Sequence, residues 1–133
     1  MYLTKLSETQ KELFLNICIS LSKIDNDFHK DEKEVISQLC DEMNIEPRYE
    51  TSIDINEAVK NINVISTVKE KRIIIVELLG LAIADKKLAF EEENFINNVM
   101  DSFNLDKSEL KEAISLVREL YDLYAKFGKF LDK

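Results

Sequence analysis

Apolar residues recur along most of the chain at the three- and four-residue spacing of an α-helix, and short polar stretches separate the stripes. The pattern predicts helices at about Ser7–Ile24, Asp31–Asn44, Ile55–Val64, Thr67–Ala84, Glu91–Phe103 and Asp106–Gly128. The run Ile73–Val76 is rich in β-branched residues, but it continues a helical stripe, so no strand is expected there. The predicted fold class is therefore all-α.

Polar residues at the expected helix ends support these boundaries. The segments 7–10 and 67–70 both have the form of a capping box, Ser/Thr followed three residues later by Gln/Glu. At the other end of the chain, we expect Gly128 to end the last helix and to leave Phe130 and Leu131 in a short tail. The aromatic stripe of this region is expected to pack on the core; it comprises Tyr121, Tyr124, Phe127 and Phe130.

The chain matches itself without a gap at an offset of sixty residues. Residues 11–45 and 71–105 share seven identities, where chance gives about two. The identical pairs are Lys11/Lys71, Leu21/Leu81, Asp25/Asp85, Glu32/Glu92, Ile36/Ile96, Asp41/Asp101 and Asn44/Asn104. We therefore predict one compact domain over residues 1–133, with about six to seven helices, built from two pseudo-symmetric helical hairpins.

Composition agrees with a soluble helical domain. Hydrophobic residues make up 45% of the chain and charged residues 33%, while two Gly and one Pro are too few for a turn-rich β fold. The net charge of -8 disfavours nucleic acid as a partner. Cys18 and Cys40 align with Leu78 and Met100 at the sixty-residue offset, so both are expected to be reduced core residues.

No targeting or membrane-spanning segment is expected. The first twelve residues carry four charges and no apolar stretch of signal length. The most apolar run, Ile73–Ala84, rises about 18 Å as a helix, well short of a bilayer. The chain is therefore expected to be cytoplasmic, and any contact with a membrane would go through a partner.

The two loops that follow the first helix of each repeat are acidic. Asp25, Asp27 and Glu32 crowd the first loop, and Asp85 and Glu92 the second. Carboxylates at this density suit Ca²⁺ or Mg²⁺, so these five residues are candidate metal ligands. The alternative is that the same carboxylates only cap helices and order their loops.

Other chemistry finds little support in the sequence. The loops are not EF-hands, because Lys30 stands where the sixth position needs Gly and Ile36 where the twelfth needs Glu. The single histidine, His29, aligns with Ala89 and is expected to be a solvated loop residue. The serines lack a plausible base, and the two glycines cannot build a phosphate loop, so the chain is not expected to be an enzyme or to need an organic cofactor.

Residues 78–85, Leu-Leu-Gly-Leu-Ala-Ile-Ala-Asp, followed by Glu92, resemble the TerB-like domain of tellurite-resistance proteins, which also occurs in a DnaJ-type membrane co-chaperone. That family shows an Ala-Asp-Gly turn with a Glu seven residues after the Asp; Asp25 and Glu32 match in the first copy. The chain departs from the family at the Gly, which is Lys86 in one loop and Asn26 in the other.

The resemblance implies an all-α domain without enzymatic activity that serves as an interaction module in stress-response or defence assemblies. Some members carry acidic cation sites, and some act near membranes. Our leading hypothesis is therefore a cytoplasmic, TerB-like module that binds a protein partner. The alternative is a divalent-cation sensor that uses the five acidic residues.

Overall fold

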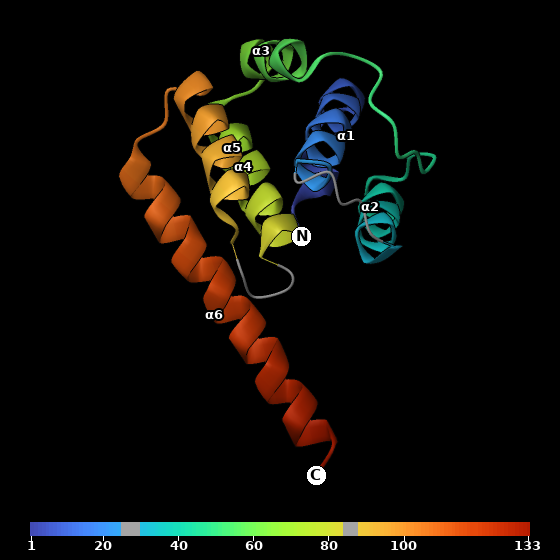
Figure 1. Ribbon diagram of the computed structural model, residues 1–133, viewed down its shortest axis with the longest axis vertical. Coiled ribbons are helices and arrows are strands. Elements are labelled where there is room, and N and C mark those ends of the chain that lie inside the picture. Colours follow the sequence, from blue (N-terminus) through green and yellow to red (C-terminus); the bar gives the residue numbers. More distant parts are fainter. Residues whose placement is uncertain (25–29, 84–87) are drawn as a thin grey trace.

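Four of the helices start at polar caps, and the result is the all-α domain that the sequence predicts (Figure 1). The computed structural model describes residues 1–24, 30–83 and 88–133, with the backbone alone for 30–32. The elements are a short 3₁₀ turn, η1 (Leu3–Lys5), and six helices: α1 (Glu8–Ser22), α2 (Lys30–Met43), α3 (Ile55–Ile65), α4 (Val68–Ala82), α5 (Phe90–Ser102) and α6 (Lys107–Leu131). No strand occurs among the described residues.

The sixty-residue offset reappears in the starts and ends of the helices. α1 and α4 have the same length and begin sixty residues apart, each behind a complete capping box. Ser7 Oγ accepts from the Gln10 backbone N–H at 3.2 Å, and Thr67 Oγ1 accepts from that of Glu70 at 3.1 Å. Equal caps in equivalent places therefore fix the register of the first helix in each half.

α2 and α5 also end alike. Asn44 and Asn104 adopt positive φ angles of 58° and 56°, a left-handed conformation that Asn tolerates better than most residues. The next residue in each half closes the turn: the backbone N–H groups of Ile45 and Leu105 donate to Cys40 O and Met100 O at 3.0 and 3.1 Å. This bond satisfies a carbonyl in the last turn that has no partner within the helix.

The core lies between α1 and α4, which pack on each other and on the helices around them. α3 covers α1, and α6 runs along α4, so each half places its third helix on its first. Ten of the fifteen residues of α1 are buried, which explains why this helix is apolar on most sides. Cys18 and Cys40 are both buried and free, as predicted.

The N-terminal segment is a part of the core that the sequence analysis did not find. Leu3 and Leu6 are buried, and η1 packs against α2 and α4. Burying a leucine side chain stabilises a fold by roughly 1.5–3 kcal/mol, so each of these two leucines contributes as much as a leucine in the core of a long helix. The segment 46–53, which lies between the predicted second and third helices, contains no helix.

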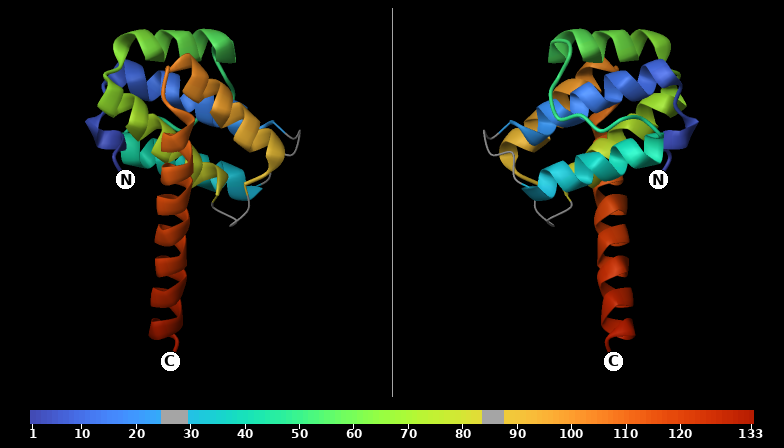
Figure 2. Two further views of the ribbon diagram at one scale, coloured as in Figure 1. Left: turned by 90° about the vertical axis from the view of Figure 1, so that its left-hand side faces the viewer. Right: turned by 90° about the vertical axis from the view of Figure 1, so that its right-hand side faces the viewer.

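Two expectations for the C-terminal region are wrong. Gly128 does not end α6, which continues to Leu131 and includes Phe130. The aromatic stripe does not pack on the core: Tyr121 is half-buried, but Tyr124, Phe127 and Phe130 are exposed. The reason is geometric, because the second half of α6 projects beyond the other helices (Figure 2).

Candidate functional site

Four of the five predicted metal ligands are not tested by the structure. Asp25, Asp27 and Asp85 lie outside the described residues, and Glu32 belongs to the part of α2 whose side chains are not described. His29 also lies outside them. Within the described ranges, no three His, Cys, Asp or Glu side chains come close enough together to hold a metal ion.

Glu92 is the one predicted ligand whose position is described. It is the third residue of α5, is half-buried, and its Oε1 accepts a hydrogen bond from the Ala89 backbone N–H at 3.3 Å. A carboxylate at this place satisfies a free N–H group and lies at the positive end of the helix dipole. Glu92 therefore has the capping role that the sequence analysis gave as the alternative to metal binding.

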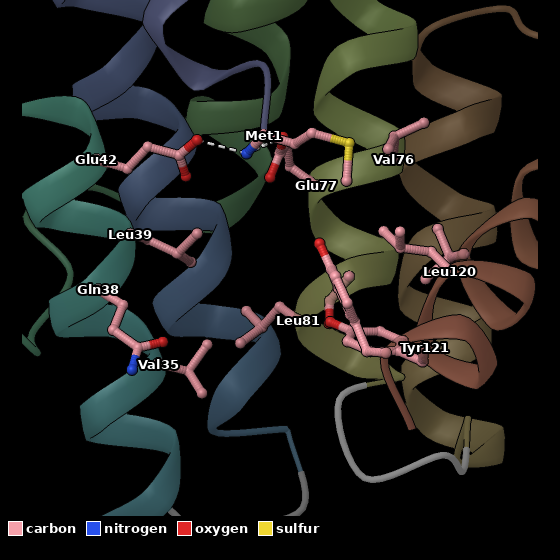
Figure 3. A pocket seen from close by; sticks show the side chains of 13 residues that line it. Met1, Val35, Gln38, Leu39, Glu42, Val76, Glu77, Leu81, Leu120 and Tyr121 are labelled. Carbon is pink, nitrogen blue, oxygen red and sulfur yellow. Dashed lines mark hydrogen bonds and ion pairs between the residues drawn. The ribbon is translucent and has the colours of Figure 1, made fainter. Parts of the chain in front are cut away.

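A concave feature of the described residues lies elsewhere, between α2, α4 and α6 (Figure 3). It is a groove of about 530 Å³, which we call the α2–α6 groove. Its lining comprises Met1, Val35, Gln38, Leu39, Glu42, Val76, Glu77, Gly80, Leu81, Val117, Leu120, Tyr121 and Tyr124. Most of these side chains are apolar, so the groove offers a hydrophobic surface inside an acidic protein.

One end of the groove is polar and carries two carboxylates. Glu77 is buried, and its Oε1 accepts from the Tyr2 backbone N–H at 2.8 Å. The Met1 ammonium lies 3.1 Å from the same Oε1 and also bonds to Glu42, which approaches from α2 (Figure 3). A buried carboxylate is tolerated only when charge and hydrogen bonds compensate it, and here the N-terminal segment supplies both.

The Met1 ammonium responds to these carboxylates. Its partial burial acts to lower its pKa, but hydrogen bonds to Glu42 and Glu77 and their negative charge outweigh that effect. The pKa of the ammonium is therefore raised above its ordinary value of 8.0. The charged form of the Met1 amine is favoured, so the polar end of the groove contains this ammonium at neutral pH.

Tyr121 forms the wall of the groove opposite α2. Its hydroxyl donates to Gly80 O at 2.6 Å, in the last turn of α4, and thereby fixes α6 against α4. Burial is the main cause that raises the pKa of Tyr121 above 10.0, and the nearby Tyr124 phenol and Glu77 act in the same direction. The phenol consequently stays protonated at neutral pH and keeps its donor proton.

A second, smaller pocket of about 370 Å³ lies between α4, α5 and α6. Arg72 Nε donates to Glu109 Oε1 there at 2.6 Å, and Leu116 lines the open side. Exposed ion pairs of this kind contribute little to stability or specificity. The α2–α6 groove is the better candidate site, because it joins a larger apolar surface to a buried carboxylate.

The polar side-chain groups among the described residues that line the groove are carboxylates, phenols and one amide. Among the described residues that line it, no His, Cys, Ser or Lys side chain is present to act as nucleophile or base beside the carboxylates. Apolar walls with a charged end are instead suited to binding a segment with an apolar face.

The groove was missed from the sequence, although one signal for it was present. The apolar run of α4 is interrupted by Glu77 and Gly80, and both residues line the groove. Both interruptions have a structural role: Glu77 accepts from the N-terminal segment, and Gly80 O accepts from the Tyr121 hydroxyl.

The chain matches no family model, no curated protein and no solved structure. Across residues 1–24, 30–83 and 88–133, no helix has both the length and the apolar character that crossing a membrane requires. Any functional proposal therefore depends on the geometry of the site and on the resemblance found in the sequence.

Proposed function

We propose that the chain is a non-enzymatic interaction module that binds an amphipathic segment of a protein partner in the α2–α6 groove. The observation that carries the proposal is the combination of an apolar floor and walls with the Glu42–Glu77 carboxylate pair at one end. Grooves with apolar walls take up helices through residues spaced by three or four positions.

The shape of the groove supports a peptide segment rather than a large flat partner. Val35 and Leu39 lie on the α2 side, and Leu120 and Tyr121 face them from α6 (Figure 3). Two apolar walls on separate helices leave a groove between them, and the apolar side chains of a partner segment fit such a groove. Two carboxylates against the one Met1 ammonium leave a net charge of about -1 at this end, which favours a segment that carries a Lys or Arg near one terminus.

The resemblance to TerB-like domains supports the wider setting of the proposal. Residues 78–85 with Glu92 carry that resemblance, and Leu81 of this stretch lines the groove. We accordingly propose a stress-response or defence-related assembly as the place where the partner is found. The divalent-cation sensor remains the alternative hypothesis, and it depends on acidic residues that lie mostly outside the described ranges.

Affinity capture from native lysate, with three variants beside the wild type, tests the proposal. Gln38→Trp adds a bulky ring at an exposed position of the groove, and Leu39→Asp places a charge on its wall. Val64→Asp is the matched control, because Val64 on α3 is 76% exposed and lines neither pocket. Circular dichroism first establishes that each variant is folded.

We expect wild type and Val64→Asp to retain the same partner and Gln38→Trp and Leu39→Asp to lose it. Retention of that partner by the folded Gln38→Trp protein would show that it binds elsewhere. No partner retained by wild type, at any salt concentration tried, would count against the interaction module itself.

A further inference from the structure

The second half of α6 leaves the body of the protein and carries a continuous apolar face (Figures 1 and 2). From Asp122 onward every side chain is exposed except that of Ala125, which is half-buried. The exposed apolar residues of this segment, which we call the α6 stripe, are Leu123, Tyr124, Phe127, Phe130 and Leu131.

The α6 stripe extends a regular heptad pattern that begins inside the domain. Positions separated alternately by three and four residues are Leu110, Ala113, Val117, Leu120, Tyr124, Phe127 and Leu131. The first four of these are buried or half-buried in the domain, and the last three are exposed. The same helix face is therefore covered by the chain itself at one end and open at the other. A heptad pattern that continues over the whole helix is typical of a helix that packs on another helix along its whole length.

Charged residues keep clear of this face. In the heptad that places Tyr124 at a and Phe127 at d, all charges from Arg118 to Lys133 fall at the outer b, c and f positions. The inner e and g positions hold Tyr121, Leu123, Gly128 and Phe130. The apolar face is accordingly wider than a simple a/d seam, and Leu123 and Phe130 extend it on one side.

The exposed area suits an interface between two chains. Phe127, Phe130 and Leu131 are 57%, 64% and 78% exposed, and Leu123 and Tyr124 about half. With about 200 Å² for each side chain, the stripe exposes on the order of 600 Å². Two such faces bury roughly 1,200 Å² when they pack together, which reaches the range of specific protein interfaces.

Gly128 provides an independent indication of a close neighbour. It lies within α6, and a Cβ at this position would have nothing within 4 Å among the described residues. Glycine inside a helix costs about 1 kcal/mol relative to Ala, and no turn, positive φ angle or contact with the described part of the chain requires it. A second helix that approaches closely on this face would require it.

We propose that the α6 stripe is the interface of a homodimer in which two α6 helices pack antiparallel. An a-to-d register places Tyr124 opposite Phe127 of the second copy, and Leu120 opposite Leu131. On one side Leu123 meets Phe130, and on the other Gly128 leaves room for Tyr121. Each apolar residue of the stripe then has an apolar partner.

Charge favours a second copy in this orientation. Residues 122–133 carry three Lys and two Asp, a net charge of +1, so the remainder of the chain carries -9. Antiparallel pairing lays the basic end of each helix against the acidic body of the other copy and places the two bodies at opposite ends of the contact. Parallel pairing would bring both acidic bodies to the same end, where they repel.

Sedimentation equilibrium of the 133-residue chain at up to roughly 100 µM tests the proposal. We expect a dimer for wild type and for Val64→Asp, which adds the same charge to an exposed apolar position away from the stripe. Phe127 is 57% exposed and lies outside the core, so we expect Phe127→Asp to raise the dissociation constant of the dimer by at least roughly 100-fold. A monomeric wild type, or a Phe127→Asp protein that still dimerises as tightly, would overturn the proposal.

Cysteine crosslinking tests the orientation. A mixture of Tyr124→Cys and Phe127→Cys chains forms a mixed disulfide in the antiparallel register, whereas Tyr124→Cys alone would crosslink to itself in a parallel pair. Flotation with vesicles of anionic lipid tests a different occupant of the α6 stripe. If the protein is a monomer and binds these vesicles through the stripe, the stripe is a membrane-binding surface and the dimer proposal is wrong. The dimer interface and the groove share Leu120, Tyr121 and Tyr124, but Phe127 does not line the groove, so Phe127→Asp tests the dimer without changing a groove residue.

Discussion

Replacement of Tyr121 by Phe removes the hydrogen bond that ties α6 to the end of α4. The phenol donates to Gly80 O at 2.6 Å, across forty-one residues of sequence. Gly80 belongs to the last turn of α4, where carbonyl groups have no partner within the helix. The substitution leaves the ring and its apolar contacts in place, so it isolates the effect of one hydroxyl.

The magnitude follows from the surroundings of the bond. A hydrogen bond within a protein contributes about 1 kcal/mol to stability, and a fully buried carbonyl left without a partner would cost up to about 3 kcal/mol. Tyr121 is half-buried, so water reaches part of the site and replaces the lost donor. We therefore expect Tyr121→Phe to lower the free energy of unfolding by about 1 kcal/mol, which corresponds to a Tm decrease of about 4 °C for a chain of this length.

Urea unfolding followed by circular dichroism measures this change, with Tyr124→Phe as the matched control. Tyr124 lies beside Tyr121 in an edge-on contact, with ring centroids 6.3 Å apart, but its hydroxyl makes no hydrogen bond to the described residues. We expect the control to change the unfolding free energy by less than about 0.3 kcal/mol. Equal effects of the two substitutions would refute the view that Tyr121 anchors α6 through its hydroxyl.

Three further predictions concern charge, thiols and cations. The folded protein raises the pKa of the Met1 ammonium, so the stabilising contribution of this ammonium is complete below about pH 8 and is lost as pH rises through the folded pKa. The urea midpoints at pH 7 and pH 10 should therefore differ less in Glu42→Gln than in wild type. Burial raises the pKa of both the Cys18 and Cys40 thiols, so a thiol reagent should modify native protein at least roughly 100-fold more slowly than unfolded protein, and equal rates would contradict their burial. Calorimetric titration with Ca²⁺ and Mg²⁺ decides the cation-sensor hypothesis: saturable binding that Asp25→Ala weakens supports it, and flat titrations up to millimolar metal exclude it.

Local signals predicted the helices well, because each signal acts within one or two turns. The capping boxes at Ser7 and Thr67 gave the starts of α1 and α4, and hydrogen bonds in the structure bear them out. Gly128 is a local signal that fails, because it does not end α6. A glycine that ends a helix usually adopts a positive φ angle, but a helix long enough to absorb about 1 kcal/mol simply continues through it, as α6 does.

The groove and the α6 stripe were beyond the reach of local signals. Apolar spacing shows that a helix has an apolar face, but it does not show which element covers that face or where the cover stops. Tyr121 and Tyr124 differ by only three residues and have the same chemistry, yet the first is half-buried and the second exposed. That difference depends on where α4 ends: its last turn contains the Gly80 carbonyl that the Tyr121 hydroxyl reaches, and the helix stops at Ala82.

The place where α4 ends also determines how the two candidate surfaces meet. Gly80 and Leu81 in the last turns of α4 line the α2–α6 groove, and beyond them α6 projects from the other described helices and becomes the stripe (Figure 2). Tyr124 belongs to both surfaces. A second copy that covers Tyr124 would therefore close the end of the groove at which Tyr124 lies. A segment bound in the groove would in turn extend the apolar face that is offered to the second copy. The two binding events are expected to influence each other, and Phe127→Asp separates them, since it removes the dimer contact and leaves every residue of the groove unchanged.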